Sequence, residues 1–148
     1  MSNELILIPR PPRPSSAAAS AVMRGNVGRN TRPELAVRRA LWALGYRYRL
    51  HVRSLPGKPD ICFPSRRKLV LVHGCFWHQH PNPGCPLRTH PRSNFAYWEA
   101  KLKRNAQRDA ANLHALKRLG WRCKVVWECE VGSVDRLRKS LVRFLGPR

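Results

Sequence analysis

The sequence predicts one α/β domain that has a mixed β-sheet flanked by helices. Three stretches repeat apolar residues at the spacing of an amphipathic helix, and others alternate with the period of two that is typical of strands. Along the chain these stretches follow the order helix, strand, hairpin, long helix, strand, helix. The length of 148 residues is that of a single domain.

The first residues have the composition of a tail. Proline, serine and alanine dominate residues 1–23, and such a segment lacks the apolar residues that a core requires. We therefore expect a disordered tail over residues 1–23 and the folded domain over residues 24–148.

The first helix is predicted to begin after Thr31. This residue is a favourable N-cap, and Glu34 follows at the spacing of a capping box. An apolar stripe continues to Leu44, and Gly45 provides a stop. The alternating residues 46–50 then predict a half-buried strand.

A hairpin is predicted next, with strands over residues 60–63 and 68–73 and a turn over residues 64–67. Residues 69–72 are apolar without a break, as in a strand that is covered on both faces. Residues 74–91 are rich in proline and lack periodicity. They predict an irregular loop that is held by something other than its own core.

A long helix, a strand and a final helix complete the domain. Apolar residues from Trp98 to Leu116 keep helical spacing, and the helix is predicted to end before Gly120. Residues 121–127 alternate as a strand does, and Ser133 can cap the last helix.

The charge of the chain restricts its partners. Lysine and arginine number 29 against 8 aspartate and glutamate, which gives a net charge of +21. Nucleic acid is the leading partner for such a surface, and an anionic membrane surface is the other. No apolar run approaches the roughly 18 residues of a membrane span. No signal peptide is apparent, so we expect a cytoplasmic protein without a membrane partner.

The proline-rich loop contains a candidate metal site. Cys75, His80 and Cys85 offer the thiolate and imidazole ligands that zinc prefers, and Cys129 is the best candidate for a fourth ligand. A structural zinc ion would explain how this loop is ordered. The alternative is a set of buried thiols and an unrelated histidine. The remaining cysteines are expected to be small core residues, namely Cys62 and Cys123.

Asp60 is a candidate magnesium ligand. A turn centred between Arg66 and Arg67 would place it across from His73. The Pro-Asp pair resembles the Pro-Asp…(Asp/Glu)-x-Lys pattern of nucleases, in which the aspartate holds Mg²⁺. The usual lysine is missing, since the matching stretch is Val-His-Gly from Val72. The alternative is that Asp60 is only a turn residue.

Aromatic residues accompany the basic ones. Phe76 and Trp77 lie in the loop and Trp98 lies in the long helix. Exposed aromatic rings on a cationic protein suit stacking on bases or wedging between base steps. The alternative is that Trp77 and Trp98 pack over the loop as a small satellite core.

Residues from about Met23 to Val131 resemble the very-short-patch repair (Vsr-type) DNA mismatch endonucleases. The motifs that carry the resemblance agree in order and spacing; they are Asn-Thr-Arg-Pro-Glu at 30–34, Leu-Pro-Gly-Lys-Pro-Asp at 55–60, Val-His-Gly-Cys-Phe-Trp-His at 72–78, Arg-Asn-Ala-Gln-Arg-Asp at 104–109, Leu-Gly-Trp-Arg at 119–122 and Val-Trp-Glu-Cys at 126–129.

The resemblance implies a restriction-endonuclease-like fold with a structural zinc site. It implies Mg²⁺-dependent nicking of double-stranded DNA on the 5′ side of the thymine in a T:G mismatch, which arises when 5-methylcytosine deaminates. It further implies mismatch-repair proteins as possible partners, and we expect a nucleoid-associated monomer.

The resemblance also assigns roles at the catalytic site. Asp60 and the backbone carbonyl of Val72 would bind Mg²⁺. His78 would be the acid/base that handles the attacking water, because imidazole titrates near neutral pH. His73 would support His78, and Asp109 would orient His73.

Glu34 matches a position near the family's active site, although it also completes the capping box of the first helix. The zinc ligands implied by the resemblance are Cys75, His80, Cys85 and Cys129. The stretch between His80 and Cys85 is longer than in the familiar family form, which indicates an inserted loop. The aromatic residues that would insert beside the mismatch are Phe76, Trp77 and Trp98.

Two other functions fit the same residues. A Vsr-like nuclease of relaxed or different specificity would keep every motif, because mismatch choice depends on loop geometry. A non-catalytic, zinc-bound nucleic-acid-binding module would keep the charge, the zinc and the aromatic residues. The missing lysine favours the module, whereas the joint presence of Asp60, His73, His78 and Asp109 favours an enzyme.

Overall fold

The computed structural model describes residues 6–13, 17 and 29–148. Its helices and strands are α2 (Arg32–Ala43), β1 (Arg49–Leu50), β2 (Ile61–Phe63), β3 (Lys68–His73), α3 (Phe95–Arg118), β4 (Arg122–Trp127) and α4 (Val134–Leu145). Two short 3₁₀ turns are η1 (Pro64–Arg66) and η2 (Glu128–Gly132). This is the predicted order of elements.

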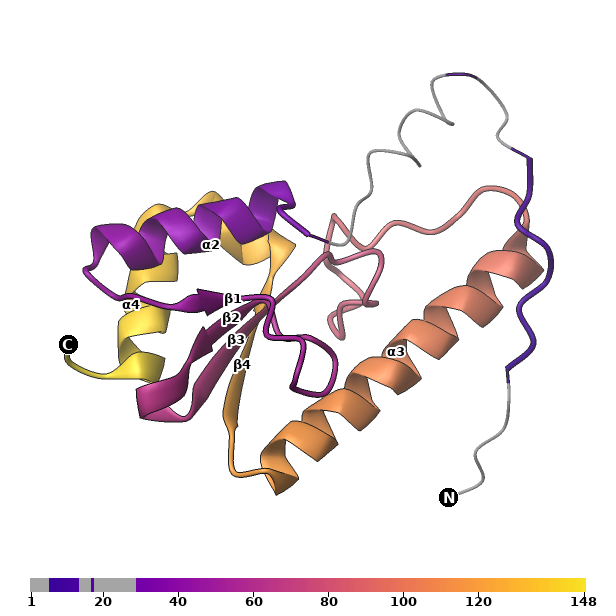
Figure 1. Cartoon of the computed structure of the whole chain (residues 1–148). Coiled ribbons are helices and arrows are strands. Elements are labelled where there is room, and N and C mark those ends of the chain that lie inside the picture. Colours follow the sequence, from indigo (N-terminus) through magenta and orange to yellow (C-terminus); the bar gives the residue numbers. More distant parts are fainter. Residues whose placement is uncertain (1–5, 14–16, 18–28) are drawn as a thin grey trace.

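The strands form one mixed sheet in the order β1-β2-β3-β4. The first three strands are antiparallel neighbours, whereas β3 and β4 are parallel. A parallel pair requires a long crossover, and the proline-rich loop together with α3 provides it (Figure 1). The predicted mixed-sheet α/β class is confirmed.

Helices cover both faces of the sheet (Figure 1). On one face α2 and α4 pack against the strands through a core that includes Leu41, Val70 and Leu141. On the other face the end of α3 packs through Leu116 onto a second cluster. The interpretation of Cys62 and Cys123 as core residues is confirmed, because Cys62 is buried in this second cluster and Cys123 packs against it.

Both predicted helix caps are present. The Thr31 hydroxyl accepts a hydrogen bond from the Glu34 amide at 3.4 Å, and Ser133 caps α4 through the Arg136 amide at 3.5 Å. The Glu34 carboxylate accepts from the amide of Asn30 at 3.0 Å, one residue before the position that a capping box uses.

The strand predicted over residues 46–50 is shorter than expected, since β1 contains only Arg49 and Leu50. The amide of Tyr46 donates back to the Leu41 carbonyl at 3.0 Å. The start of the predicted strand therefore belongs to the exit from α2, which the alternating pattern could not show.

The predicted hairpin register was wrong by two residues. Ile61 pairs with Val70, and continuing this register places Asp60 opposite Leu71 rather than His73. The turn occupies residues 64–67 as predicted, but its centre lies between Ser65 and Arg66, and Arg67 adopts a left-handed conformation directly after η1. A shift of two residues keeps side chains on the same face of a sheet, so Asp60 and His73 still face the same region.

The predicted tail over residues 1–23 lies mostly outside the described residues. Among its described residues, 6–13 lie in no helix or strand. Among the residues that the structure describes, no helix combines the length and the apolar character that a membrane span requires.

Candidate active site and metal centre

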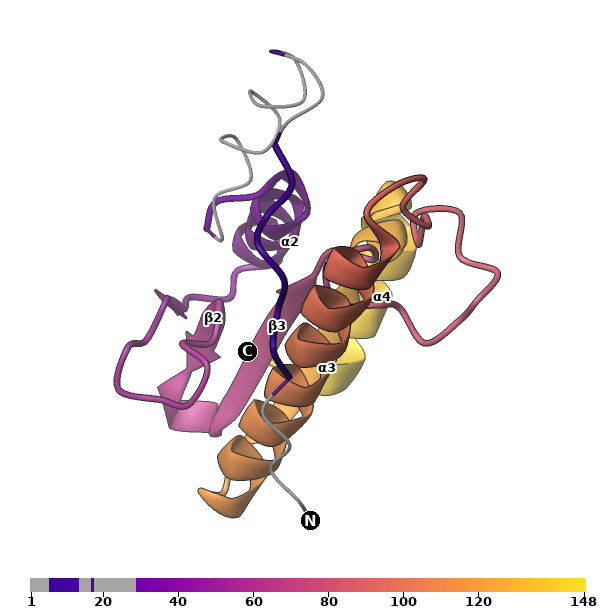
Figure 2. The same cartoon turned by 90° about the vertical axis from the view of Figure 1, so that its right-hand side faces the viewer.

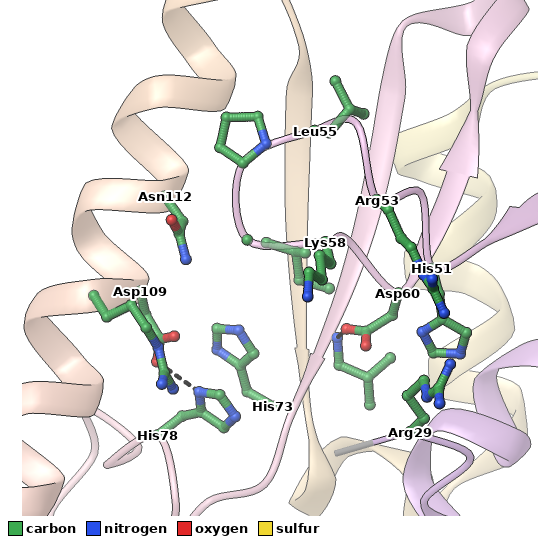
Figure 3. A pocket seen from close by; sticks show the side chains of 15 residues that line it. Arg29, His51, Arg53, Leu55, Lys58, Asp60, His73, His78, Asp109 and Asn112 are labelled. Atoms are coloured by element: carbon green, nitrogen blue, oxygen red, sulfur yellow. Dashed lines mark hydrogen bonds and ion pairs between the residues drawn. The ribbon is translucent and has the colours of Figure 1, made fainter.

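A cavity of about 830 Å³ opens where β3 ends, between the loop that precedes β2 and the middle of α3. Five of the predicted site residues line it: Asp60, Val72, His73, His78 and Asp109. Figure 3 shows Asp60 on one side of this cavity and the pair of His78 and Asp109 on the other, with His73 between them.

A histidine–carboxylate pair forms the α3 side of the cavity. Nδ1 of His78 and Oδ2 of Asp109 are 2.5 Å apart. Because an ionised carboxylate can only accept hydrogen bonds, Nδ1 donates, and in a neutral ring Nε2 would carry the lone pair. Asp109 therefore orients His78, and not His73 as predicted.

His73 supports this pair by stacking. Its ring lies parallel to the ring of His78, at 4.0 Å between centroids and 6° between planes. Burial, followed by the neighbouring His78, lowers the pKa of His73 to about 4. His73 is therefore neutral at neutral pH, so it does not repel a positive charge on the neighbouring His78.

Asp60 is held at the opposite side by the backbone of β3. Its Oδ2 accepts a hydrogen bond from the Val72 amide at 2.8 Å. Burial raises the pKa of Asp60 to about 6, against the lowering effect of that hydrogen bond. The other carboxylate oxygen makes no hydrogen bond to the described residues, and a bound cation would offset the cost of burying the charge.

Glu34 reaches this region through His51, a residue that the sequence analysis missed. Glu34 is only 2% exposed and does not line the cavity, but its Oε1 lies 3.0 Å from Nε2 of His51. His51 does line the cavity. Its amide donates to the Asp60 carbonyl at 3.1 Å, so the sheet itself sets these two residues side by side.

A second cluster lies in the proline-rich loop and brings together the four predicted zinc ligands, Cys75, His80, Cys85 and Cys129. One ligand atom of each lies within 4.8 Å of the others. Sulfur ligands around tetrahedral zinc lie about 3.8 Å apart, and the cysteines are free thiols. The donor set and its compactness fit a zinc ion, with η2 supplying Cys129 from beyond β4.

The three predicted intercalating residues form one partly buried aromatic cluster between the loop and α3. Phe76, Trp77 and Trp98 meet edge to face, with centroids 5.1 to 5.8 Å apart. The Lys101 ammonium lies 5.5 Å from the Trp77 ring and 5.6 Å from the Trp98 ring. Asn105 of α3 anchors the loop by donating to the Trp77 carbonyl at 3.1 Å. Figure 2 shows how the loop leaves the sheet and joins the start of α3.

Basic residues surround the cavity. Arg29, Arg53, Lys58 and Arg108 contribute to its walls. Guanidinium and ammonium groups at the mouth of a cavity bind phosphate oxygens. The arrangement combines a buried carboxylate, an oriented imidazole and phosphate-binding cations, which is chemically suited to phosphodiester hydrolysis.

Comparison with known proteins agrees with this chemistry. A family model described as DNA mismatch endonuclease Vsr matches residues 15–83. The chain is 49% identical over 119 residues to the type II nicking enzyme V.XorIIP of Xanthomonas oryzae pv. oryzae, covering 80% of this chain and 85% of that protein. It is 35% identical over 121 residues to the DNA mismatch endonuclease Vsr of Escherichia coli K12, covering 82% and 76%.

A third relative is the type II nicking enzyme V.NaeI of Lentzea aerocolonigenes, which is 42% identical over 124 residues. The family resemblance stated from the motifs is confirmed, and with it the expectation of an enzyme. The chain belongs to the Vsr family of DNA mismatch endonucleases, which are DNA-cleaving hydrolases.

Proposed function

We propose that this protein nicks one strand of double-stranded DNA on the 5′ side of the thymine in a T:G mismatch. The observation that carries the proposal is the placement of Asp60 and of the His78–Asp109 pair around a single cavity. The relative from Escherichia coli that is named a DNA mismatch endonuclease supports the mismatch as substrate.

His78 is proposed to activate the attacking water. The Nδ1 atom of His78 is hydrogen-bonded to Asp109. Nε2 can therefore take a proton from a water molecule that lies between the ring and a bound phosphodiester. The Asp109 carboxylate then stabilises the imidazolium that forms. His73 remains neutral because it is buried, and its stacked ring keeps His78 from turning away.

Asp60 and the Val72 carbonyl are proposed to hold Mg²⁺. A buried carboxylate with one oxygen available, next to the backbone of a strand end, offers the oxygen ligands that Mg²⁺ prefers. When bound, Mg²⁺ would neutralise charge that develops on the cleaved phosphate. A valine at position 72 is no obstacle, because the proposed ligand is its backbone oxygen.

The zinc site is proposed to be structural. The four ligands Cys75, His80, Cys85 and Cys129 leave no open position for a substrate on a tetrahedral ion. We extend the proposal to a restriction-endonuclease-like fold over residues 24–148, in which this ion orders the loop that bears Trp77 and His78.

Phe76, Trp77 and Trp98 are proposed to read the mismatch. A wobble pair is easier to unstack than a matched pair, so an aromatic wedge can convert that difference into selectivity. The cluster is only partly buried, and Lys101 beside it can contact the DNA backbone.

A nuclease of relaxed or different specificity is the second candidate. Two of the relatives described above are named nicking enzymes, and those names do not mention a mismatch. The family membership argues against the third alternative, the non-catalytic module, because these relatives are named for cleavage.

A strand-resolved nicking assay tests the proposal. Labelled duplexes with one T:G pair and matched duplexes are incubated with Mg²⁺ or with EDTA, in varied flanking sequence. We expect a Mg²⁺-dependent nick confined to the thymine strand of the mismatch. Equal cleavage of matched duplex would favour the relaxed nuclease, and binding without any cleavage would contradict both.

A further inference from the structure

A basic side chain that the proposed mechanism does not use points into the cavity beside Asp60. Lys58 lines the cavity together with Asp60, His73 and His78. Figure 3 shows its side chain pointing into the space between Asp60 and His73. The end of β3 provides no ammonium group, because its last residues are Val72 and His73. Lys58 therefore brings a positive charge to the place where the nuclease pattern lacks its lysine.

Lys58 is presented by a tight turn that has an unusual backbone. The amide of Lys58 donates to the Leu55 carbonyl at 3.1 Å, which closes a turn over residues 55–58. Gly57 has a φ of 72° and Lys58 a φ of 48°, and both lie in the left-handed region. Glycine adopts this region freely, whereas a residue with a side chain does so at a cost. Backbone strain of this kind concentrates at functional sites, so the lysine at this position indicates a use for its side chain.

Packing fixes the turn between the two sides of the site. A Cβ atom at Gly57 would lie 2.7 Å from Nδ2 of Asn112 on α3, so the turn and the helix are in close contact. Asn112 follows Asp109 by three residues on the same helix face, and both line the cavity. On the other side Pro59 is fully buried. Lys58 is thus held in place by α3 on one side and by a buried neighbour on the other.

The ammonium group of Lys58 is available to a substrate. Lys58 is exposed, and within the described part of the chain it forms no ion pair. Asp109 pairs with His78 instead, and Oδ2 of Asp60 accepts from the Val72 amide. A cation without an acidic partner in a cavity attracts an anionic ligand, and lysine binds phosphate oxygens as a point charge.

We propose that Lys58 is a catalytic residue whose ammonium group binds a non-bridging oxygen of the scissile phosphate and stabilises the negative charge that develops there. During cleavage the water oxygen bonds to phosphorus, and one water proton passes to Nε2 of His78. The bond from phosphorus to the leaving oxygen breaks, and its electron pair stays on that oxygen. Lys58 keeps its proton throughout. This proposal rests on the proposed function only in that the scissile phosphate lies in this cavity.

A general contact with the DNA backbone is the competing interpretation. Arg29, Arg53 and Arg108 also line the cavity, and a cation can strengthen DNA binding without acting on the chemical step. The two roles change different quantities. Loss of a contact that is stronger in the transition state lowers the rate constant of the bound complex, whereas loss of a general contact lowers the affinity.

The test separates the nicking rate from DNA affinity. Single-turnover nicking is measured with Mg²⁺ and saturating enzyme, and affinity is measured by fluorescence anisotropy in EDTA. We expect Lys58→Met to lower the rate constant by about 10²-fold or more and to weaken affinity by less than about tenfold. Lys139→Met removes the same group from an exposed position of α4 and should behave as the wild type. An unchanged rate constant in Lys58→Met would overturn the proposal.

Sulfur substitution at the scissile phosphate tests the contact itself. Each of the two non-bridging oxygens is replaced in turn by sulfur, and the slowing of nicking is compared in wild type and Lys58→Met. If Lys58 contacts one of these oxygens, the slowing at that oxygen should be smaller in the variant, because the contact is already lost. Identical slowing in both proteins for both substitutions would contradict the proposal.

Lys58→Asn covers the case in which Lys58→Met fails to fold, because asparagine tolerates a left-handed backbone. The same loss of rate is expected, with zinc content and melting temperature as in the wild type, and a wild-type rate would again overturn the proposal. Failure of the proposed function is recognised separately, in the wild type alone. Equal nicking of matched and mismatched duplex would contradict the mismatch specificity and leave the comparison at Lys58 intact, whereas cleavage of neither duplex would overturn both proposals.

Discussion

The charge of one carboxylate decides which nitrogen of His78 can accept a proton. The Asp109 carboxylate accepts a hydrogen bond from Nδ1 of His78, which leaves Nε2 as the nitrogen that would act as the proposed base. An asparagine at this position could still accept a hydrogen bond, but it would neither hold the tautomer as firmly nor stabilise the imidazolium.

Asp109→Asn should therefore lower the single-turnover nicking rate by about 10²-fold or more and leave DNA affinity nearly unchanged. Glu99→Gln removes the same charge from an exposed position of the same helix and serves as the control. Comparable rates for the two variants would remove Asp109 from the mechanism.

Trp77 provides a second prediction at this scale. Base–aromatic stacking contributes about 1–3 kcal/mol per base, so Trp77→Ala should reduce the ratio of nicking rates on mismatched and matched duplex by about tenfold. Trp42 is 57% exposed on α2, so Trp42→Ala serves as the control and should leave the ratio of the two nicking rates unchanged. If Trp77→Ala slows both substrates equally, the tryptophan is a general contact or a packing residue.

Sequence reasoning identified individual site residues unevenly. The family motifs marked Asp60, His73, His78 and Asp109, and all four line the cavity. His51 carried no motif, since a histidine after a short alternating stretch is unremarkable. Only the pairing of Leu50 with Ile61 shows that His51 must lie beside Asp60, and that register was not deducible from spacing.

At the scale of elements, the proposed zinc site would tie the loop after β3 to a distant turn. Cys75 and Cys85 belong to the loop, whereas Cys129 belongs to η2. Removing one thiolate from a four-ligand site weakens the binding of the metal ion and releases the segment that the ion orders.

Cys129→Ser should thus lower the zinc content below one ion per chain and destabilise the fold by about 2 kcal/mol or more. The corresponding fall in melting temperature is roughly 5 °C, measured by thermal unfolding alongside metal analysis. The Cys123→Ser variant, changed at a residue of β4 that packs against the second core cluster, should keep its zinc. Full zinc occupancy in Cys129→Ser would mean that another residue is the fourth ligand.

Element boundaries were predictable where local chemistry decides them. Thr31 and Ser133 mark helix starts because their hydroxyls satisfy free amides. The bounds of the turn between β2 and β3 were predicted correctly, but its centre was placed one residue too late; the left-handed conformation of Arg67 is rare for a residue other than glycine and carried no signal in the sequence. A turn centre that lies one residue earlier moves the strand partner of Asp60 by two positions.

For the whole molecule, the net charge of +21 implies that counterion release dominates DNA binding. If six or more phosphates are neutralised, affinity should fall by about 10³-fold or more between about 50 and 200 mM salt. Fluorescence anisotropy at several salt concentrations gives the slope of the logarithm of the DNA-binding constant against the logarithm of the salt concentration.

Arg108→Ala, at the cavity wall, should reduce the magnitude of that slope by about one. Arg143→Ala, at an exposed position of α4 on the other face of the sheet, should leave it unchanged. Identical slopes for both variants would show that the cavity is not the surface that meets the phosphates.

The connection between β3 and β4 has a consequence for the order in which the site assembles during folding. β2 and β3 are joined by a tight turn, so Asp60 and Val72 can meet through contacts that are local in sequence. His78 and Asp109 belong to the crossover and to α3, which dock only when the parallel β3–β4 pair closes, and such non-local pairing is slow. The carboxylate side of the site is thus expected to form early in folding, and the imidazole side to form late.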